Sequence, residues 1–466
     1  MNQPASKSAL GTLISVFFFW GFVAASNDIL IPVFKEKLEL EQWASQIISF
    51  AFYVAYTVGS ILYFGISRLT GGDILNRIGY KNGIALGLAI SACGTLLFYP
   101  AAETASFPVF ITGLFIVGLG FSLQQTAANP LAINLGGAEK GAQRLSLAGG
   151  INNIGTTIGP VVVSFAIFGG LAKGAHLDNL QAVRTPYLAL GAAFIIVALL
   201  FLWSSLPNQL QHTSAANKTD KSGSALQFPQ LWMGMIAIFL YVGVEVATAS
   251  NLPEFLKQHA GIATDGVAPY VSLFWASLMI GRWTSAVEAF NAPPRWQMLL
   301  NVLLPYAAFG VFLLVNYLAG NSLQPFWLYA AIIPIIIAAN YFTKGNPAKQ
   351  LWLYSALGSI ALVIGMLSGG LVSAYAFISV GLFCSTLWPC IFTLAIHGLG
   401  KHTNNGSALL IMMIMGGGII SLLQGYLADP QYLGIQWSYL VGVACFLYLA
   451  FYGWKMGGRL KAVAAA

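Results

Sequence analysis

Long apolar segments separated by short polar breaks run from one end of the 466-residue chain to the other. A helix of about 20 mostly apolar residues crosses roughly 30 Å of hydrocarbon and satisfies its own backbone hydrogen bonds there. The first part of the chain shows such segments at 9–34, 46–69, 82–102, 107–135, 144–170 and 186–206. The second part shows them at 229–257, 267–290, 298–319, 325–343, 350–368, 370–398, 405–428 and 433–456. The pattern predicts an all-α integral membrane protein with about 14 transmembrane helices.

The composition supports a membrane protein, because 58% hydrophobic and 8% charged residues are not typical of a soluble globule. One segment, 207–228, differs from the rest by its content of Ser, Asn, Lys and Gly, which is typical of a solvated linker. It divides the chain into an N-terminal six-helix bundle at 1–206 and a C-terminal bundle at 229–466. We therefore expect two helical bundles joined by a cytoplasmic linker.

Basic residues lie mostly on one side of the predicted spans. With the amino terminus inside, Lys35, Lys37, Lys173, Arg184 and Lys257 fall outside, and the rest of the 21 Lys and Arg fall inside. Positive charge resists export, so this asymmetry predicts cytoplasmic N- and C-termini. The formal net charge of +7 is spread over short inside loops, and we expect no nucleic-acid partner.

The two parts of the chain look like diverged copies. "FFFWGFVAASNDILIPVFK" in the first helix and "FLYVGVEVATASNLPEFLK" in the seventh share an aromatic run, a glycine, small and polar residues, a proline, a phenylalanine and a lysine. Two six-helix repeats on an axis along the membrane normal are the organisation of major facilitator transporters, whose substrate site lies between the halves. The chain resembles that superfamily, and we expect its fold.

A loop motif adds to this resemblance. "GGDILNRIGYK" is similar to the superfamily's signature of glycine, acid, arginine, glycine and a basic residue, with Asn76 where an acid is usual. This departure weakens the motif as a gating lock. The residues that we assign to a gating loop are Gly72, Asn76, Arg77, Gly79 and Lys81, with Arg282 of "GRWTSAVEAF" in the second half.

The two helices in excess of twelve suggest an inserted hairpin at about 298–343. A pair of helices inserted there leaves every later helix with its original orientation, and Lys344 and Lys349 then fall inside, as the charge pattern requires. An insertion through the central cavity would disturb both halves. We therefore expect the hairpin to be peripheral and structural.

Several motifs in order carry a closer resemblance, to the fucose–galactose–glucose cation symporter family. They are "SNDILIP", "LQQTAANPLAINLG", "RLSLAGGINNIGTTIGP", "YVGVEVATASNLPEFL", "IGRW" and "NNGSALLIMMIMGGGIIS". The resemblance covers the chain from the first to the last helix except for the hairpin. It implies cation-coupled import of a hexose-like sugar across a bacterial inner membrane.

Two acidic residues lie deep in the predicted spans, Asp28 in the first helix and Glu245 in the seventh. Ionisable groups inside a bilayer usually face a cavity and take part in ion or substrate movement, so both are candidates for coupling the ion. A carboxylate in a low-dielectric cavity can take up H⁺ or ligate Na⁺. Thr248 and Ser250 could complete a Na⁺ site with Glu245, and we favour H⁺ slightly. The resemblance to the glucose/galactose branch implies a glutamine in the fourth helix and a glutamate in the seventh, as found here.

Amide side chains in the fourth and fifth helices suit a sugar, whose hydroxyls both donate and accept hydrogen bonds. Gln125 and Asn129 share a helix face, and Asn152 repeats the chemistry in the fifth helix. Gln124 and Asn153 fit a helix-tying role equally well. Aromatic rings can stack on the apolar faces of a sugar. The full set of predicted substrate-binding residues is Asn27, Gln125, Asn129, Asn152, Ser250, Asn251, Trp275 and Trp388.

Other function classes lack sequence support. No nucleotide-binding loop of the form G-x-x-x-x-G-K-[ST] occurs, and the four cysteines lack C-x-x-C spacing. We expect no metal, no cofactor besides the coupling ion, no enzymatic activity and a monomer in the lipid bilayer. The alternatives are a proton-coupled antiporter of drugs or metabolites and, less favoured, a non-transporting membrane sensor or embedded enzyme.

Overall fold

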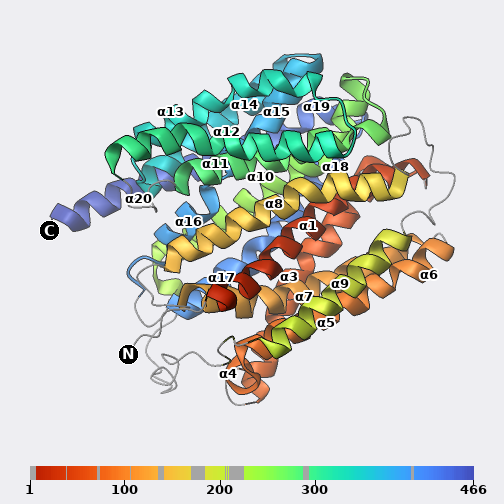
Figure 1. Cartoon of the computed structure of the whole chain (residues 1–466). Coiled ribbons are helices and arrows are strands. Elements are labelled where there is room, and N and C mark those ends of the chain that lie inside the picture. The colour runs from red at the N-terminus through yellow and green to blue at the C-terminus, as the bar shows by residue number, and fades with distance from the viewer. Residues whose placement is uncertain are drawn as a thin grey trace.

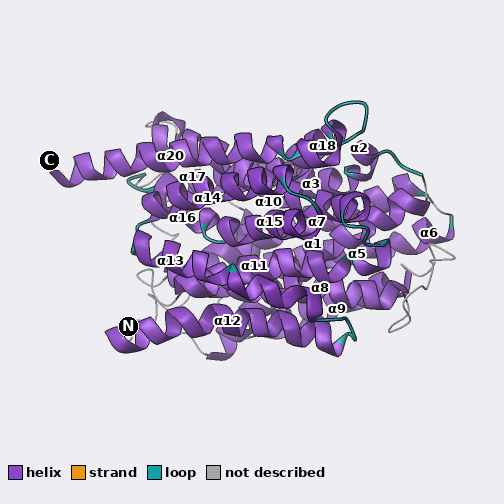
Figure 2. Ribbon diagram, turned by 90° about the horizontal axis from the view of Figure 1, so that it is seen from above, coloured by secondary structure: helices purple, strands orange, loops and turns teal. Residues whose placement is uncertain are grey.

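The structure is a computed structural model that describes residues 7–37, 39–70, 74–104, 106–134, 141–168, 184–204, 206, 208, 225–286, 293–399 and 403–465. Within these ranges the regular structure is entirely helical, as Figure 2 shows. Most of the predicted linker at 207–228 lies outside the described residues. The domain boundaries therefore remain predictions.

The helices of the first half follow the apolar segments closely. They are α1 (Lys7–Lys37), α2 (Gln42–Ser45), α3 (Ile47–Leu69), α4 (Ile74–Ile78), α5 (Tyr80–Leu96), α6 (Phe98–Glu103), α7 (Phe107–Asn134), α8 (Gly141–Phe168) and α9 (Arg184–Trp203). α1 begins at one end of the bundle, here called the near face, and ends at the opposite end, the far face (Figure 1). α20 also ends at the near face.

The second half contains several interrupted spans. Its helices are η4 (Ala225–Gln227), α10 (Pro229–His259), η5 (Thr264–Gly266), α11 (Ala268–Ala286), α12 (Pro294–Leu318), η7 (Gln324–Ala331), α13 (Ile333–Thr343), α14 (Pro347–Leu367), α15 (Gly370–Cys384), α16 (Leu387–Ile396), α17 (Thr403–Met412), η9 (Met413–Met415), α18 (Gly416–Leu427), α19 (Gly434–Ser438) and α20 (Leu440–Ala465). Here η marks 3₁₀ segments.

The expected count of about 14 spans is slightly too high by composition. Twelve helices in the described part are long and apolar enough to cross a membrane. The two that fall short are α1, whose qualifying apolar stretch is the shorter Gly11–Ser26, and α11. In α11, the polar side chains of Ser272, Ser277 and Arg282 lower the mean hydropathy. These side chains make hydrogen bonds inside the protein.

The two halves repeat one packing pattern. In the first half α5 packs between α7 and α9, and in the second half α14 packs in the same way between α15 and α20. Likewise α1 lies along α8, and α10 lies along α18. Figure 1 shows the first half below the second, and α8 lies next to α11 across their boundary. The interface between the halves is also formed by α3 and α18 and by α1 and α10.

α12 and α13, which cover the predicted hairpin, lie outside this repeated pattern. α12 packs on α11, and α13 contacts both α11 and α14. The span Arg295–Leu318 is the least buried of the twelve, with 22% of its apolar window buried. Tyr329 and Ser277 share a hydrogen bond of 2.7 Å between their hydroxyls, which attaches the hairpin to α11.

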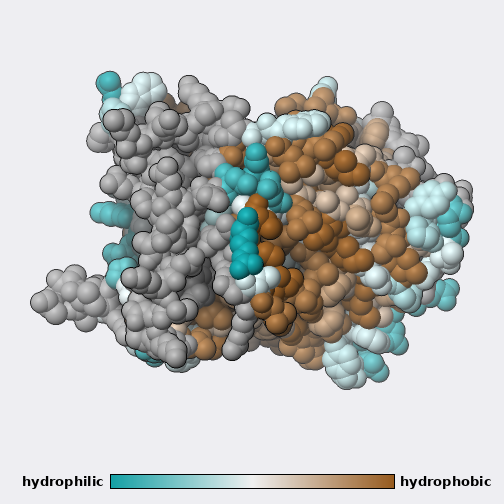
Figure 3. All heavy atoms as spheres, turned by 90° about the horizontal axis from the view of Figure 1, so that it is seen from below, coloured by the Kyte–Doolittle hydropathy of each residue, from teal (hydrophilic) through white to brown (hydrophobic). Residues whose placement is uncertain are grey.

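Apolar side chains cover much of the described surface. Figure 3 shows a broad brown area on one face, with paler and teal residues toward its end. Large exposed residues of α5 and α9, such as Leu86, Ile196 and Trp203, belong to the apolar surface of the protein. An exposed apolar surface of this kind fits contact with lipid rather than water.

Close contact between α1 and α8 depends on glycine. A Cβ atom added at Gly21 would lie 2.0 Å from the carbonyl oxygen of Asn152, and one at Gly155 would lie 2.1 Å from that of Phe18. Small residues allow helix backbones to approach closely where no hydrophobic effect drives association. The α1–α8 pair is therefore a tightly fitted unit at the interface.

We predict that Gly21→Ala destabilises the protein by about 1–3 kcal/mol, because the added methyl group forces the α1 and α8 backbones apart. The measurement is thermal unfolding in detergent. Gly11→Ala is a matched control on the same helix, since nothing lies within 4 Å of a Cβ at Gly11. Equal melting temperatures for the two variants would contradict this account.

Candidate functional site

Glu245 lies near the middle of α10 and is the described acid at greatest depth in the second half. The hydroxyl of Tyr241, one turn earlier, donates a hydrogen bond to Oε2 of Glu245. The ring of Tyr241 lies 6.2 Å from that of Trp388 on α16, and Trp388 stacks on Phe392. The carboxyl group of Glu245 thus lies beside an aromatic wall formed by Tyr241, Trp388 and Phe392, close to the interface.

A cation lies close to this acid. The Nε of Arg282, on α11, donates to the carbonyl oxygen of Ser385 at 3.0 Å. Its Nη1 donates to the first half, to the carbonyl oxygen of Gly149 at 3.2 Å and to Oδ1 of Asn153 at 2.8 Å. The guanidinium also attracts the Glu245 carboxylate electrostatically. Arg282 therefore joins the two halves and interacts electrostatically with the candidate coupling acid, Glu245.

The structure allows this approach through two glycines of α8. A Cβ at Gly149 would lie 3.3 Å from Nη1 of Arg282, and one at Gly150 would lie 3.4 Å from Nε1 of Trp283. The "GG" of "LAGGINN" thus faces the "RW" of "IGRW" across the interface. From the sequence, Arg282 is assigned to the gating-loop residues. In the structure it lies inside α11, and its hydrogen bonds to Gly149 and Asn153 connect the two halves.

The two adjacent glutamines of α7 have different environments. Gln124 is fully buried, accepts a hydrogen bond from Trp20 Nε1 at 2.8 Å and donates to Ser91 Oγ at 3.0 Å. It therefore ties α7 to α1 and α5. Gln125 is only partly buried and donates to the hydroxyl of Tyr56 on α3 at 3.0 Å. No described residue donates to the amide oxygen of Gln125, so this oxygen can accept from a ligand.

Two of the other amides of the first half, those of Asn152 and Asn153, already form hydrogen bonds within the protein. Asn129 is partly buried, one turn from Gln125. Asn152 donates to the carbonyl oxygen of Phe17 at 2.9 Å, which ties α8 to α1. The buried Asn153 binds Arg282 through its oxygen. Asn153 therefore connects the halves instead of tying helices within one half.

The predicted polar ligands of the second half already make hydrogen bonds within the protein. The hydroxyls of Thr248 and Ser250 donate to backbone oxygens of their own helix at 2.6 Å each. Ser250 lies about 140° around the helix from Glu245. Asn251 donates to the carbonyl of Ala247 and accepts from Gln42 at 2.9 Å. These contacts favour structural roles, and a Na⁺ site at Glu245, Thr248 and Ser250 stays a prediction.

The remaining predicted residues lie in two settings. Trp275 is buried with its ring edge-on to Phe274, inside the second half. The side chains of Asn27, Asp28 and Asn76, and Gly72 as a whole, lie outside the described residues. The role of Asp28 as a second coupling acid therefore stays a prediction.

The described part of the gating loop packs on the end of the first half. Arg77 is exposed and donates to the carbonyl of Thr70. Gly79 has φ of 90°, which favours glycine, and Lys81 donates to the carbonyl of Ser204 at 3.2 Å. These contacts lie within one half, whereas Arg282 reaches across to the other.

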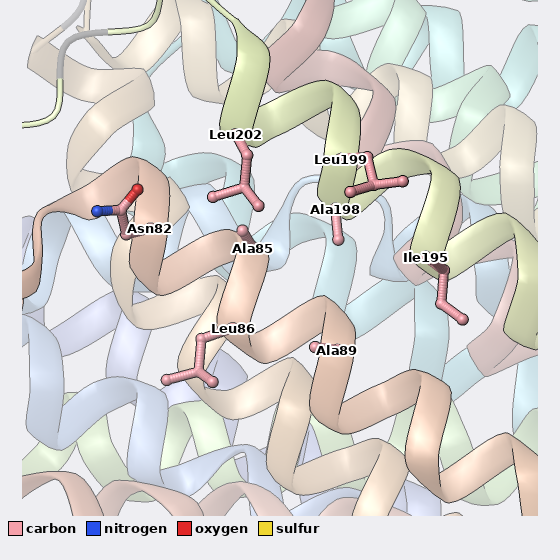
Figure 4. Close-up of a pocket in the computed structure, with 8 residues that line it drawn as sticks. All are labelled: Asn82, Ala85, Leu86, Ala89, Ile195, Ala198, Leu199 and Leu202. Carbon is pink, nitrogen blue, oxygen red and sulfur yellow. The ribbon is translucent and has the colours of Figure 1, made fainter.

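A pocket of about 370 Å³ lies elsewhere, between α5 and α9 (Figure 4). Its lining is apolar apart from Asn82, and its walls include Leu86, Ile195 and Leu202, which are about half exposed at the surface. It lies on the lipid-facing side of the first half and shares no residue with the site described above. Among the described residues, no group of three or more His, Cys, Asp or Glu could hold a metal.

Sequence reasoning missed Tyr56, Tyr53 and Tyr241. Tyr53 and Tyr56 stack at 6.3 Å on α3, and Tyr53 faces Gly417 of α18 across the interface. Tyr241 precedes Glu245 by four residues, a spacing that puts both on one helix face. That spacing was the available signal; the tyrosines of α3 offered none among 19 in the chain.

Comparison with known proteins gives consistent results. The family model described as Major Facilitator Superfamily matches residues 9–343. The chain is 34% identical over 454 residues to a glucose/galactose transporter of Brucella abortus, covering 97% of this chain and 95% of that protein. It is 28% identical to the L-fucose-proton symporter of Escherichia coli, covering 93% and 90%. A crystal structure of a single-residue variant of the E. coli fucose:proton symporter FucP matches with a TM-score of 0.65 and 25% identity, covering 96% and 98%.

We predict that Gln124→Leu lowers the free energy of unfolding by about 1–3 kcal/mol, because it leaves the buried donor of Trp20 without its acceptor. The measurement is thermal unfolding of the purified protein. Gln125→Leu serves as the neighbouring control and should be closer to the parent. A larger loss for Gln125→Leu would contradict the assignment of Gln124 as the structural member of the pair.

Proposed function

Because the chain belongs to the Major Facilitator Superfamily, we propose that it is a secondary active transporter that imports a monosaccharide together with a cation. The observation that carries the proposal is the Tyr241–Glu245 pair beside Trp388. This pair lies next to the guanidinium of Arg282, which joins the halves. An ionisable residue inside a membrane is costly and usually takes part in ion or substrate movement, and a change in its charge can alter how the halves hold each other. The names of the relatives support a hexose-like substrate.

We place the sugar between Gln125 and the aromatic wall of Trp388. The amide oxygen of Gln125 and the hydroxyl of Tyr56 offer an acceptor and a donor to sugar hydroxyls. Trp388, partly buried beside Tyr241, offers an apolar surface for the C–H face of the ring. The tightly bonded Gln124 and Asn153 do not belong to this binding set.

We assign H⁺ as the coupling ion. Glu245 already accepts a hydrogen bond from Tyr241, and the hydroxyls of Thr248 and Ser250 donate to their own helix. A proton needs only the carboxyl oxygen, whereas Na⁺ needs a shell of several oxygens. The relative named L-fucose-proton symporter supports the same choice.

The link from ion to movement is Arg282. When Glu245 is ionised, its carboxylate competes with Asn153 and Gly149 for the guanidinium; when Glu245 is protonated, that competition ends. The charge of Glu245 thus determines how firmly Arg282 holds the first half. We further propose a monomer in the inner membrane, with the near face in the cytoplasm.

We predict that Glu245→Gln abolishes uphill sugar accumulation and preserves sugar exchange in part. The amide can still accept from Tyr241 but cannot take up a proton. The measurement is uptake of radiolabelled glucose, galactose or fucose into vesicles, with H⁺ and Na⁺ gradients imposed separately. Tyr241→Phe is the control, because it removes the phenol and keeps the carboxyl, and it should still accumulate sugar. Parental accumulation by Glu245→Gln would refute the coupling role.

We also predict that Gln125→Ala weakens sugar binding by about 1–3 kcal/mol, the cost of leaving a buried partner unpaired. The ion dependence of the remaining transport should not change. Sugar affinity is measured by tryptophan quenching and compared with the melting temperature. A destabilised variant with parental affinity would remove Gln125 from the binding site.

A further inference from the structure

A second polar cluster lies at the far face, where the two halves meet again. Gln42 and Gln46, at the two ends of α2, come from the first half, and Asp429 follows the end of α18 in the second half. All three are more than nine-tenths buried, with exposed fractions of 4% for Gln42, 0% for Gln46 and 7% for Asp429. The proposed sugar site and Arg282 do not use any of them.

The orientation of both amides is fixed by their partners. Nδ2 of Asn251 donates to the carbonyl of Ala247, so its Oδ1 must accept, and Gln42 must present Nε2 to it, at 2.9 Å. Gln46 presents Nε2 to the carbonyl oxygen of Ser250 at 3.4 Å. Both glutamines therefore turn their Oε1 atoms away from α10.

Three buried oxygen atoms in this cluster lack a donor among the residues that the structure describes. They are Oε1 of Gln42, Oε1 of Gln46 and Oδ2 of Asp429. The other carboxyl oxygen of Asp429 accepts from the backbone nitrogen of Gln42 at 3.2 Å. Buried polar atoms are nearly always paired, so a cluster of three unpaired acceptors indicates a missing donor.

Gly425 allows α2 to approach the end of α18 closely. A Cβ at Gly425 would lie 2.5 Å from Cγ of Gln46 and 3.4 Å from the carbonyl oxygen of Gln42. Gly425 precedes Asp429 by four residues, and Gln42 precedes Gln46 by four residues. The α2 segment therefore packs closely against the end of α18, which Asp429 follows.

The charges around Asp429 do not neutralise a carboxylate. Lys35 attracts it weakly, because Lys35 already pairs with Glu254 at 2.6 Å, and Glu41 repels it. Tyr432, which shares a hydrogen bond with Tyr426, also interacts with it and offers no positive charge. Burial is the largest effect and raises the pKa of Asp429 above its usual range.

We propose that Asp429 is a proton-binding site that, with Gln42 and Gln46, closes the far side of the interface. A proton from water at the far face binds Oδ2 as the halves close, and the new O–H group can donate to one of the two amide oxygens at a time. The proton returns to water when the halves separate. This proposal needs only the movement of the halves and does not depend on the sugar or on Glu245.

The pH dependence follows from the sign of the shift. The closed state has the higher pKa for Asp429, so closing binds a proton. Above an ordinary carboxyl pKa of about 4, the ratio of closed to open molecules falls by about tenfold per pH unit until the closed-state pKa is reached. Below and above this window the contribution of Asp429 to the ratio is constant.

The test measures the distance between the far ends of the halves without sugar. Thr104→Cys and Ser322→Cys place spin labels on exposed positions of the first and second half. The exposed native Cys93 is replaced by serine, and Cys384, Cys390 and Cys445 are buried. Pulsed electron paramagnetic resonance between pH 4 and 9 gives the closed and open populations of the full chain.

The expected result is a shift from closed to open as pH rises. Asp429→Asn should stay closed across the range, because its amide supplies a donor without a charge, and Asp429→Ser should also lose the pH step. Glu39→Gln removes an exposed acid next to the same segment and should keep it. Glu245→Gln removes any contribution of Glu245 to the pH dependence and should keep the step that comes from Asp429, which separates this proposal from the proposed coupling role. A parental pH step in both Asp429 variants, or no step in the parent, would overturn the proposal.

Discussion

The positive charge of Arg282 between two helix bundles is the constraint on which the arrangement depends. A guanidinium at this depth is costly unless acceptors surround it, and it obtains them from both halves, through Ser385 on one side and through Gly149 and Asn153 on the other. Any separation of the halves at this level must provide replacements. The nearby carboxyl of Glu245 is one such replacement, so in the coupling mechanism that we propose, binding of the ion and contact between the halves compete for the same donor.

The far face is held together by different chemistry. Its rim carries the Lys257–Glu36 pair at 3.4 Å, with both side chains nearly half exposed, and such pairs contribute little to stability. The buried contacts there are made by the amides of Gln42 and Gln46, which donate to Asn251 and Ser250 of α10. One end of the interface thus depends on a guanidinium shared between the halves, and the other on neutral amides together with the Lys35–Glu254 pair at 2.6 Å, so the two ends respond to different conditions.

The sequence was sufficient for the spans and insufficient for side-chain partners. The seventh helix was predicted at 229–257 and is Pro229–His259 in the structure, because a long apolar run in lipid leaves the backbone no alternative to a helix. Gln124 and Gln125 are neighbours of one type, and only packing separates the bonded Gln124 from the available Gln125. Likewise, Arg282 resembled a loop residue because its partners are far away in the chain.

The break between α15 and α16 has a mechanical consequence. The span Gly370–Ile396 is not one rod: α15 ends at Cys384 and α16 begins at Leu387, and the carbonyl of Ser385 between them is held by Arg282. The next span is interrupted as well, by η9 at Met413–Met415, just after Met412, whose carbonyl accepts from Thr57 of the first half. Each break is therefore held by one hydrogen bond at the interface. Arg282 holds the first break, and Thr57 of the first half holds the second. When these two hydrogen bonds break, the near-face segments α16 and α17 can tilt while the far-face segments α15 and α18 stay in place. The second half therefore need not move as a single block.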